Sequence, residues 1–279
     1  MRHWLALLIA FALGAAFAQQ QPPATYIPQT KFASGQDVVP SFDGWIKNPD
    51  GTFTLVFGYM NRNYEQELAI GAGPDNKLEP GAADQGQPTY FLPRRHAWVF
   101  RVKVPADFGN KELVWTITAN GRAEKAYGHL IPSEEITERV IRTRGNLSPG
   151  LDDPNQPPSI SIAPVVGARL GEAVALVAMV TDDGLPKPRV PKVRPAVTGA
   201  KAQSNSSAGA SRLGLTVTWV EYGGPAKVTF DEAGSLLVAG GQAATKAHFN
   251  QAGTYVLRAT ANDGALSTAA DVTVVVSAN

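Results

Sequence analysis

The sequence predicts an all-β fold made of two tandem β-sandwich domains that follow a signal peptide. Short runs of alternating apolar and polar residues recur about every ten residues, with turn-forming residues between them. The chain is 44% hydrophobic but only 18% charged. Its polarity comes mainly from Gly, Pro, Ser, Thr, Asn and Gln, which favour strands and turns over helices. Its length of 279 residues allows two domains of ordinary size.

The clearest pair of strands lies near the C-terminus. Two alternating runs, Thr254–Ala261 and Ala269–Ser277, flank the sequence Asn262-Asp263-Gly264. Asp-Gly between two alternating runs is a strong signal for a β-hairpin. We therefore expect the second domain to end in a hairpin.

The N-terminus has the pattern of a secretory signal peptide. Arg2 and His3 precede the apolar stretch Trp4–Leu13, and Ala16-Phe17-Ala18 matches a cleavage site. We expect residues 1–18 to be removed and residues 19–34, rich in Gln and Pro, to form a flexible leader. An uncleaved anchor is the alternative, although the apolar stretch is short for a span. The pattern predicts a secreted, periplasmic or cell-surface protein with no transmembrane span after cleavage.

The absence of cysteine and the balanced charge exclude several functions. The chain has no cysteine, so disulfides, thiol catalysis and cysteine metal sites are excluded. Its formal net charge is +1, which favours neither nucleic acid nor an acidic surface as a partner. We therefore expect no nucleic-acid partner.

The first domain is predicted to cover residues 35–145. Strand alternation places Tyr59, Trp98 and Trp115 in its core. Gly71–Pro88 is rich in Gly, Pro, Asp and Asn and is expected to be a loop. Residues 133–143 fit either a helix that Ser133 caps or an extended segment. The expected strands are Thr52–Met60, Glu67–Ile70, Trp98–Val104, Leu113–Thr118 and Ala123–His129.

A proline-rich linker, residues 146–158, is predicted to lead into the second domain, residues 159–279. Its prolines stiffen it, so the two domains should keep a limited range of separations. Within the second domain, residues 186–212 are basic, contain no acidic residue and include many Ser, Ala, Gly and Pro residues. Such a segment has too little apolar surface to order itself, so we expect a disordered basic insertion between two strands.

The second domain contains several motifs in a recognisable order. Over residues 155–279 these are Asn155-Gln156-Pro157-Pro158, Val180-Thr181-Asp182-Asp183-Gly184, Leu215-Thr216-Val217-Thr218-Trp219, Gly224-Pro225 and Ala252-Gly253-Thr254-Tyr255. The set resembles PKD-like and immunoglobulin-like β-sandwich repeats of bacterial exported proteins, which serve mostly as spacers and binding modules. The basic insertion departs from the compact pattern and is either a local decoration or an interaction feature.

The resemblance also implies structural roles for four residues. Trp219 would pack over the centre between the sheets. Gly253 and Tyr255 would form a tyrosine corner, in which the phenol bonds back to the chain a few residues upstream. Leu257 would replace the cysteine of antibody domains with an apolar contact. The first domain resembles uncharacterised exported bacterial proteins through Gly58–Asn63, Gln85–Thr89 and Phe91–Arg95, which implies no activity.

The sequence has no mark of a catalytic site. The nucleophile motif Gly-x-Ser-x-Gly is absent, and His96, His129 and His248 lie far apart in sequence. The metal-ligand spacing His-x-x-x-His is also absent. We therefore expect a protein that is not an enzyme and needs no cofactor.

Calcium is the one metal that the sequence leaves open. The pairs Asp152-Asp153 and Asp182-Asp183, and Asp263, stand at strand ends or in the linker, where β-sandwiches can gather oxygen ligands. The same residues are ordinary turn formers. Both interpretations remain open at this point.

Glycan binding would use exposed aromatic and basic side chains of the first domain. Trp45, Tyr64 and Tyr90 lie outside the clear strands and could form exposed platforms, or they could anchor loops to the core. Arg62, Arg94 and Arg95 could form a basic patch for an anionic glycan, or they could be plain solvated surface.

These observations predict an exported, non-enzymatic binding or structural module. Its partner would be a protein or glycan of the cell envelope. The first domain is the better candidate for recognition because its loops are longer. Two alternatives remain: a carbohydrate-binding module that uses first-domain aromatics, and an enzyme whose site lies on the first-domain loops.

Overall fold

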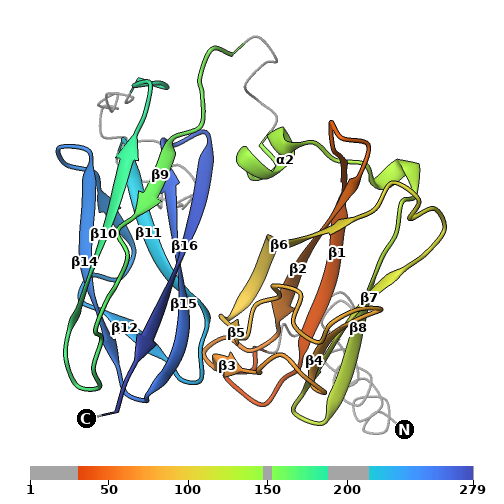
Figure 1. Ribbon diagram of the computed structural model, residues 1–279, viewed down its shortest axis with the longest axis horizontal. Helices are drawn as coiled ribbons and strands as arrows, with labels where there is room; N and C mark the ends of the chain where they lie inside the picture. The colour runs from red at the N-terminus through yellow and green to blue at the C-terminus, as the bar shows by residue number, and fades with distance from the viewer. Residues whose placement is uncertain (1–30, 147–152, 188–213, 279) are drawn as a thin grey trace, which may run out of the picture. The chain divides into compact units, whose positions relative to one another are not determined.

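The computed structural model describes residues 31–146, 153–187 and 214–278, and these form antiparallel sheets with little helix (Figure 1). The predicted all-β fold class is therefore confirmed. Residues Phe32–Asn279 make up one compact unit. The predictions for the signal peptide, most of the leader, Asp152 and nearly all of the basic insertion lie outside the described residues.

The first sandwich is built from two three-stranded sheets and a short strand pair. The sheets have the orders β1-β2-β6 and β4-β7-β8, and β3 pairs with β5. The bounds are β1 Val38–Lys47, β2 Phe53–Asn61, β3 Leu68–Ala69, β4 Asn76–Glu79, β5 Tyr90–Phe91, β6 Arg94–Val104, β7 Leu113–Ala119 and β8 Arg122–Gly128.

Aromatic side chains from both sheets form the core of this sandwich. Phe57 of β2 stacks on Phe100 of β6 with ring centroids 5.3 Å apart. Phe100 in turn meets Trp115 of β7 edge to face at 4.7 Å. Such pairs add about 0.5–1.5 kcal/mol each beyond the area they bury. The two sheets are therefore held together by aromatic contacts in place of a disulfide.

Strand β4 lies inside Gly71–Pro88, which the sequence predicts to be loop throughout. Asn76, which is 0% exposed, explains this difference. Its Nδ2 donates to the carbonyls of Ile70, at 2.9 Å, and Pro88, at 2.8 Å. Its Oδ1 accepts the indole N–H of Trp115 at 2.9 Å. One buried amide thus ties both ends of the segment together and places it against β7.

A bulge in the β2–β6 pairing overturns the expectation that Trp98 is a core residue. The register shifts between Phe57 and Tyr59. Trp98 has a φ of 54° and is only partly buried, and its main-chain N–H donates to Asp43 Oδ2 at 2.7 Å. Because residues 97–99 of β6 lie opposite the single residue Gly58 of β2 and Trp98 has a positive φ, alternation counted back from Phe100 fails at this point.

The segment after β8 contains two short helical turns. They are the 3-10 turn η2, Pro132–Glu134, and the helix α2, Glu138–Arg142. Between them, Ile136 donates its N–H to the carbonyl of Trp45 at 2.8 Å. The helical alternative for residues 133–143 therefore holds for only five of them.

The second sandwich has two four-stranded sheets, β12-β14-β10-β9 and β13-β11-β15-β16 (Figure 1). The first matches the A-B-E-D order and the second contains the C-F-G order of an immunoglobulin-like sandwich, with β13 added beside the C strand. The bounds are β9 Ser159–Ile162, β10 Val174–Thr181, β11 Thr216–Gly223, β12 Val228–Phe230, β13 Ser235–Leu237, β14 Gln242–Phe249, β15 Gly253–Asn262 and β16 Ser267–Val276.

The residues with expected structural roles all lie in or beside the core of this sandwich. Trp219 is 6% exposed and Leu257 is fully buried. The Tyr255 hydroxyl donates to the carbonyl of Gln251 at 2.8 Å, which is the geometry of a tyrosine corner. Gly253 has a φ of 153°, and a Cβ there would lie 2.8 Å from Pro225 Cγ. Only glycine fits that position without strain.

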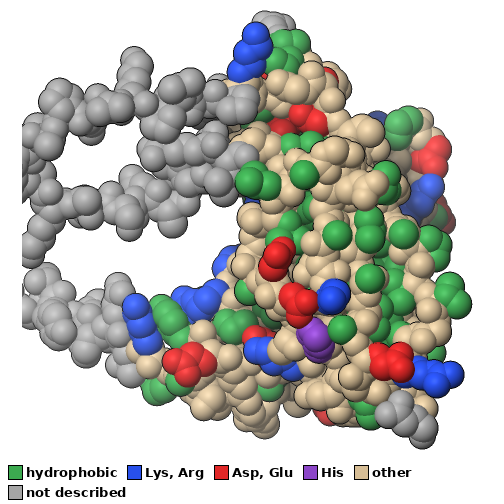
Figure 2. All heavy atoms as spheres, turned by 90° about the vertical axis from the view of Figure 1, so that its left-hand side faces the viewer, with side chains coloured by type: hydrophobic (Ala, Val, Ile, Leu, Met, Phe, Trp, Pro, Cys, Tyr) green, Lys and Arg blue, Asp and Glu red, His purple; other side chains and the backbone are tan. Residues whose placement is uncertain are grey.

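The outer face of β10 and β14 carries no large patch of one kind. Figure 2 shows small hydrophobic side chains scattered among polar and backbone atoms on this side, with positive and negative groups close together. His248 and Asp231, for example, are paired at 2.5 Å. This face therefore lacks the contiguous apolar or single-charge surface that marks many binding sites.

Replacing Trp219 by alanine should cost about 3–5 kcal/mol of folding free energy, because a buried indole is lost from the centre of the second sandwich. Urea unfolding followed by circular dichroism measures this loss. Leu237→Ala is the matched control, since Leu237 is 59% exposed and should change stability by less than about 0.5 kcal/mol. Equal stabilities for Trp219→Ala and wild type would contradict the role of Trp219.

Candidate functional site

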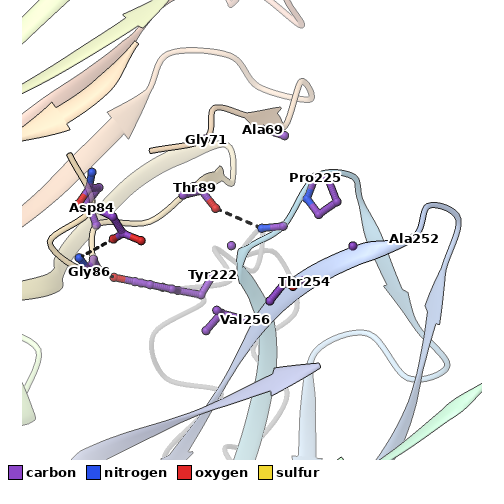
Figure 3. A pocket seen from close by; sticks show the side chains of 14 residues that line it. Ala69, Gly71, Asp84, Gly86, Thr89, Tyr222, Pro225, Ala252, Thr254 and Val256 are labelled. Carbon is purple, nitrogen blue, oxygen red and sulfur yellow. Dashed lines mark hydrogen bonds between the residues drawn. The ribbon is translucent and has the colours of Figure 1, made fainter. Parts of the chain in front are cut away.

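A groove with a volume of about 670 Å³ lies between residues of the two sandwiches (Figure 3). Its accessible lining is more apolar than polar, and Asp84 is its one charged residue among the described residues. Glycine and alanine make up half of the lining, so main-chain groups are accessible along it. The lining residues are Ala69, Gly71, Asp84, Gly86, Gln87, Thr89, Tyr222, Gly223, Gly224, Pro225, Ala252, Gly253, Thr254 and Val256.

Thr89 and Tyr222 join the two walls of the groove. The main-chain N–H of Thr89 donates to the carbonyl of Tyr222 at 3.2 Å. The Thr89 hydroxyl oxygen accepts the N–H of Gly224 at 3.2 Å, and the Tyr222 hydroxyl donates to the carbonyl of Gly86 at 2.6 Å. Figure 3 shows Thr89 facing the second sandwich and Tyr222 reaching toward Gly86. We call this set of contacts the joint.

A bulge in β11 makes the joint possible. The pairing of β11 with β15 skips Tyr222, because Glu221 pairs with Leu257 and Gly223 pairs with Val256. The Tyr222 side chain packs against the core of the first sandwich. Burial raises the pKa of Tyr222, so its hydroxyl remains protonated and remains a donor.

Arg258 holds Tyr222 from the other side. Its guanidinium carbon lies 3.9 Å from the centroid of the Tyr222 ring. Nη1 donates to the carbonyl of Val99 in β6 at 2.5 Å. Nε and Nη2 donate to the two carboxylate oxygens of Asp271 at 2.7 and 2.8 Å. One arginine therefore connects β15, β16 and the first sandwich, which a lysine could not do with a single ammonium group.

Lys227 and Glu67 form an ion pair beside the groove. Lys227 Nζ lies 2.7 Å from Glu67 Oε1, and the hydroxyl of Tyr90 donates to Glu67 Oε2 at 2.6 Å. Burial is the largest cause that raises the pKa of Tyr90, followed by the bond to Glu67. This pair adds a charge contact to the neutral hydrogen bonds of the joint.

Glu221 lies beneath the groove and is only 4% exposed. Its Oε2 accepts the N–H of Val228 at 2.8 Å, whereas Oε1 has no hydrogen-bond partner within the described part of the chain. Burial raises the pKa of Glu221 to about 7. A buried carboxyl group with a free oxygen is costly unless it is protonated.

The sequence does not predict the joint, although one residue of β11 gives a signal of an unusual environment there. In β11 the alternation that places Val217 and Trp219 in the core continues to position 221, where it meets a glutamate. An acidic residue on a core-facing position is unusual and indicates a special environment. Thr89 and Tyr222 carry no comparable signal, because pairing between distant segments leaves no local pattern.

The aromatic side chains predicted as glycan platforms are mostly buried. Of the two alternatives for Trp45, the structure supports the anchor: the residue belongs to β1, is 7% exposed and donates its indole N–H to the carbonyl of Ile131 at 2.8 Å. Tyr90 is also buried, in β5. Tyr64 is 39% exposed, and the Arg94 guanidinium carbon lies 4.0 Å from its ring centroid. The structure does not bring Trp45 and Tyr64 to one exposed surface.

The three predicted arginines each contact a different group of the first sandwich. Arg62 contacts Asp37 at 3.2 Å, and Arg95 contacts Asp43 at 2.5 Å. The side chains of Asp37 and Asp43 are 0% and 5% exposed. Arg94 covers the Tyr64 ring. Two of the three positive charges are therefore compensated by buried carboxylates, which weakens their attraction for an anionic glycan.

The described residues among the predicted calcium ligands accept main-chain hydrogen bonds. Asp263 accepts the N–H of Ala265 at 2.6 Å and the amide of Asn155 at 3.1 Å. Asp153, Asp182 and Asp183 each accept an N–H from a residue two positions later. Among the described residues, no three acidic or histidine side chains form a group that could hold a metal ion. Calcium binding stays a prediction.

The histidines are separated and have local contacts. His96 stacks on Tyr59 with centroids 4.9 Å apart, and burial lowers its pKa. His129 meets Phe42 edge to face at 5.1 Å. These contacts give both rings a place in the packing of the first sandwich.

Comparisons with known proteins do not assign a family. No protein-family model and no curated protein matches the chain. Among solved structures, the D00-D0 domain of intimin matches with a TM-score of 0.28 and 10% identity, covering 86% of this chain and all of that chain. The Yersinia pseudotuberculosis adhesin InvE matches with a TM-score of 0.25 and 12% identity, covering 86% of this chain and 58% of that chain. At these scores the fold assignment rests on the sheet topology alone.

In residues 31–146, 153–187 and 214–278, no helix has the length and hydropathy needed to cross a bilayer.

Replacing Arg258 by lysine should destabilise the protein by about 1–2 kcal/mol, because the two bonds to Asp271 and the bond to Val99 cannot all be kept. Arg101→Lys is the matched control. Arg101 also makes a two-point contact, with Glu138, but both side chains are more than 40% exposed and the change should cost less than about 0.5 kcal/mol. Urea unfolding measures both variants, and equal effects would contradict the importance of Arg258.

The free energy of unfolding should fall as pH rises from about 4.5 to about 7, through the Glu221 carboxyl group. The folded protein keeps this proton to higher pH than the unfolded chain does, so unfolding releases a proton in that window. The slope from this group is at most about 1.4 kcal/mol per pH unit. Chemical unfolding at several pH values should show a flatter profile for Glu221→Gln than for wild type. Parallel profiles would contradict the prediction.

Proposed function

We propose that this chain is an exported, non-enzymatic binding module that takes a protein or glycan of the cell envelope into the groove. The observation that carries the proposal is the groove itself, which has two walls held together by the joint. A site that is largely formed before binding avoids part of the ordering cost of association. Export rests on the signal-peptide pattern of residues 1–18.

The lining favours a neutral ligand that offers both apolar surface and hydrogen-bonding groups. Thr89, Thr254 and Tyr222 supply hydroxyl groups, and the glycines leave main-chain donors and acceptors accessible. The carboxylate of Asp84 would repel an anionic ligand. Sugars and extended peptides both carry the hydroxyl or amide groups that such a lining can bond.

The carbohydrate-binding alternative built on Trp45 is not supported, because that ring is buried in β1. The second alternative, a catalytic site on the first-domain loops, is not supported by the groove either. In the part of the chain that the structure describes, the groove lining contains no histidine, lysine or cysteine that could act as a base or nucleophile beside its one carboxylate.

Retention on envelope material tests the proposal. The full mature chain is mixed either with purified peptidoglycan sacculi or with beads that carry solubilised envelope proteins, and the bound fraction is measured after sedimentation. Wild type should be retained on one of the two probes. Thr254→Trp places a large ring in the groove and should lower retention at least about tenfold, a loss of about 1.4 kcal/mol.

Thr229→Trp is the matched control, since Thr229 is exposed on β12 and is absent from the groove lining. It should be retained like wild type. Equal retention of Thr254→Trp and Thr229→Trp would show that the groove is not the binding site. No retention of wild type on either probe would reject the proposed partner class.

A further inference from the structure

The Glu221 carboxyl group lies directly below the segment that lines one wall of the groove. A Cβ placed on Gly224 would lie 2.6 Å from Glu221 Oε1. Gly223, Gly224 and Pro225 all line the groove. Any change in the space or hydration that this carboxyl group requires must therefore move the groove wall.

The segment from Gly223 to Val228 is bonded both to Glu221 and to the first sandwich. Val228 donates its N–H to Glu221 Oε2, and Gly224 donates its N–H to the Thr89 hydroxyl. Lys227, in the middle, pairs with Glu67. The segment thus connects the state of the carboxyl group to two contacts with the first sandwich, Gly224–Thr89 of the joint and the Lys227–Glu67 ion pair beside it.

Within residues 31–146, 153–187 and 214–278, no charged group compensates the free oxygen of Glu221. Lys227 is the nearby cation, and it is already paired with Glu67. Glu67 itself is negative and disfavours ionisation of Glu221. The two facing phenols are also committed, Tyr255 to the carbonyl of Gln251 and Tyr90 to Glu67. The ionised form would leave a buried charge with one hydrogen bond, a state that proteins avoid by admitting water or moving a cation.

We propose that Glu221 is a proton-operated latch for the joint. With the carboxyl group protonated, segment 223–228 stays packed over it and against Thr89. When the proton leaves to solvent, the segment lifts so that water or the Lys227 ammonium reaches Oε1, and the Gly224–Thr89 and Lys227–Glu67 contacts break. The joint then loosens, and the groove loses one wall.

The latch changes state near neutral pH, because burial raises the pKa of Glu221 to about 7. The loosened joint implies weaker ligand binding above that pH. This last step alone rests on the proposed function, whereas the movement of the joint does not.

A distance measurement between spin labels tests the latch without any ligand. The chain contains no cysteine, so cysteines introduced at Lys125 of β8 and Lys246 of β14, both exposed, are the only labelling sites. Pulsed electron paramagnetic resonance should give a narrow distance distribution at about pH 5.5 and a broad one at about pH 8.5, on either side of the transition. In the same labelled chain, Glu221→Gln should stay narrow at both pH values.

Glu232→Gln is the matched control, because Glu232 is an exposed acid of the same sandwich. It should keep the wild-type transition. A transition that persists in Glu221→Gln, or a wild-type distribution that does not change with pH, would overturn the latch. Circular dichroism establishes that each variant is folded.

Direct titration of wild type keeps the proposal testable even if Glu221→Gln misfolds. The carboxyl carbon of Glu221, followed by nuclear magnetic resonance, should titrate with a midpoint near 7. A midpoint near the ordinary value of 4.5 would overturn the proposal. Failure of envelope binding would leave these results unaffected, so the latch and the proposed function can fail separately.

Discussion

The arrangement of the groove depends on the bulge in β11 between Glu221 and Gly223. Regular pairing would commit the main chain of Tyr222 to β15. Because the bulge skips this residue, its carbonyl accepts a hydrogen bond from Thr89 instead. The bulge therefore lets β11 of the second sandwich contact the first sandwich. It also places the Glu221 carboxyl group on one side of the strand and the Tyr222 phenol on the other. Bulges often redirect side chains in this way next to functional sites.

Buried polar groups hold strand ends and loops in place in this protein, a role that disulfides fill in many other proteins. Asn76 connects the ends of Gly71–Pro88 to Trp115, and Tyr255 fixes the start of β15 through Gln251. Each such bond contributes only about 1 kcal/mol, but loss of one partner leaves the other unsatisfied in the core. The role of Tyr255 is predicted by its sequence motif. The asparagine has no motif, since its partners come from three separate places in the chain.

The sequence predicts the fold class and most strands because alternation and turn chemistry are local. It fails where tertiary contacts override the local pattern. Strand β4, with the sequence Asn-Lys-Leu-Glu, is a strand only because Asn76 and β7 hold it. Trp98 leaves the core because of a bulge, and Trp45 enters it because β1 pairs with β2. The groove could not be predicted, since its walls lie more than a hundred residues apart in sequence; only the glutamate on the core-facing side of β11 pointed to it.

The hydrogen bond from Asn155 to Asp263 has a consequence for how far the groove walls can separate. It attaches the last part of the linker to the hairpin turn of the second sandwich. Asn146 and Asn155 are nine positions apart in the sequence, so they can lie at most about 30 Å from each other whatever path the chain takes. Two groove walls joined by so short a stretch of chain have a high effective concentration with respect to each other. If the joint opens, its closure would therefore not depend on the concentration of the protein.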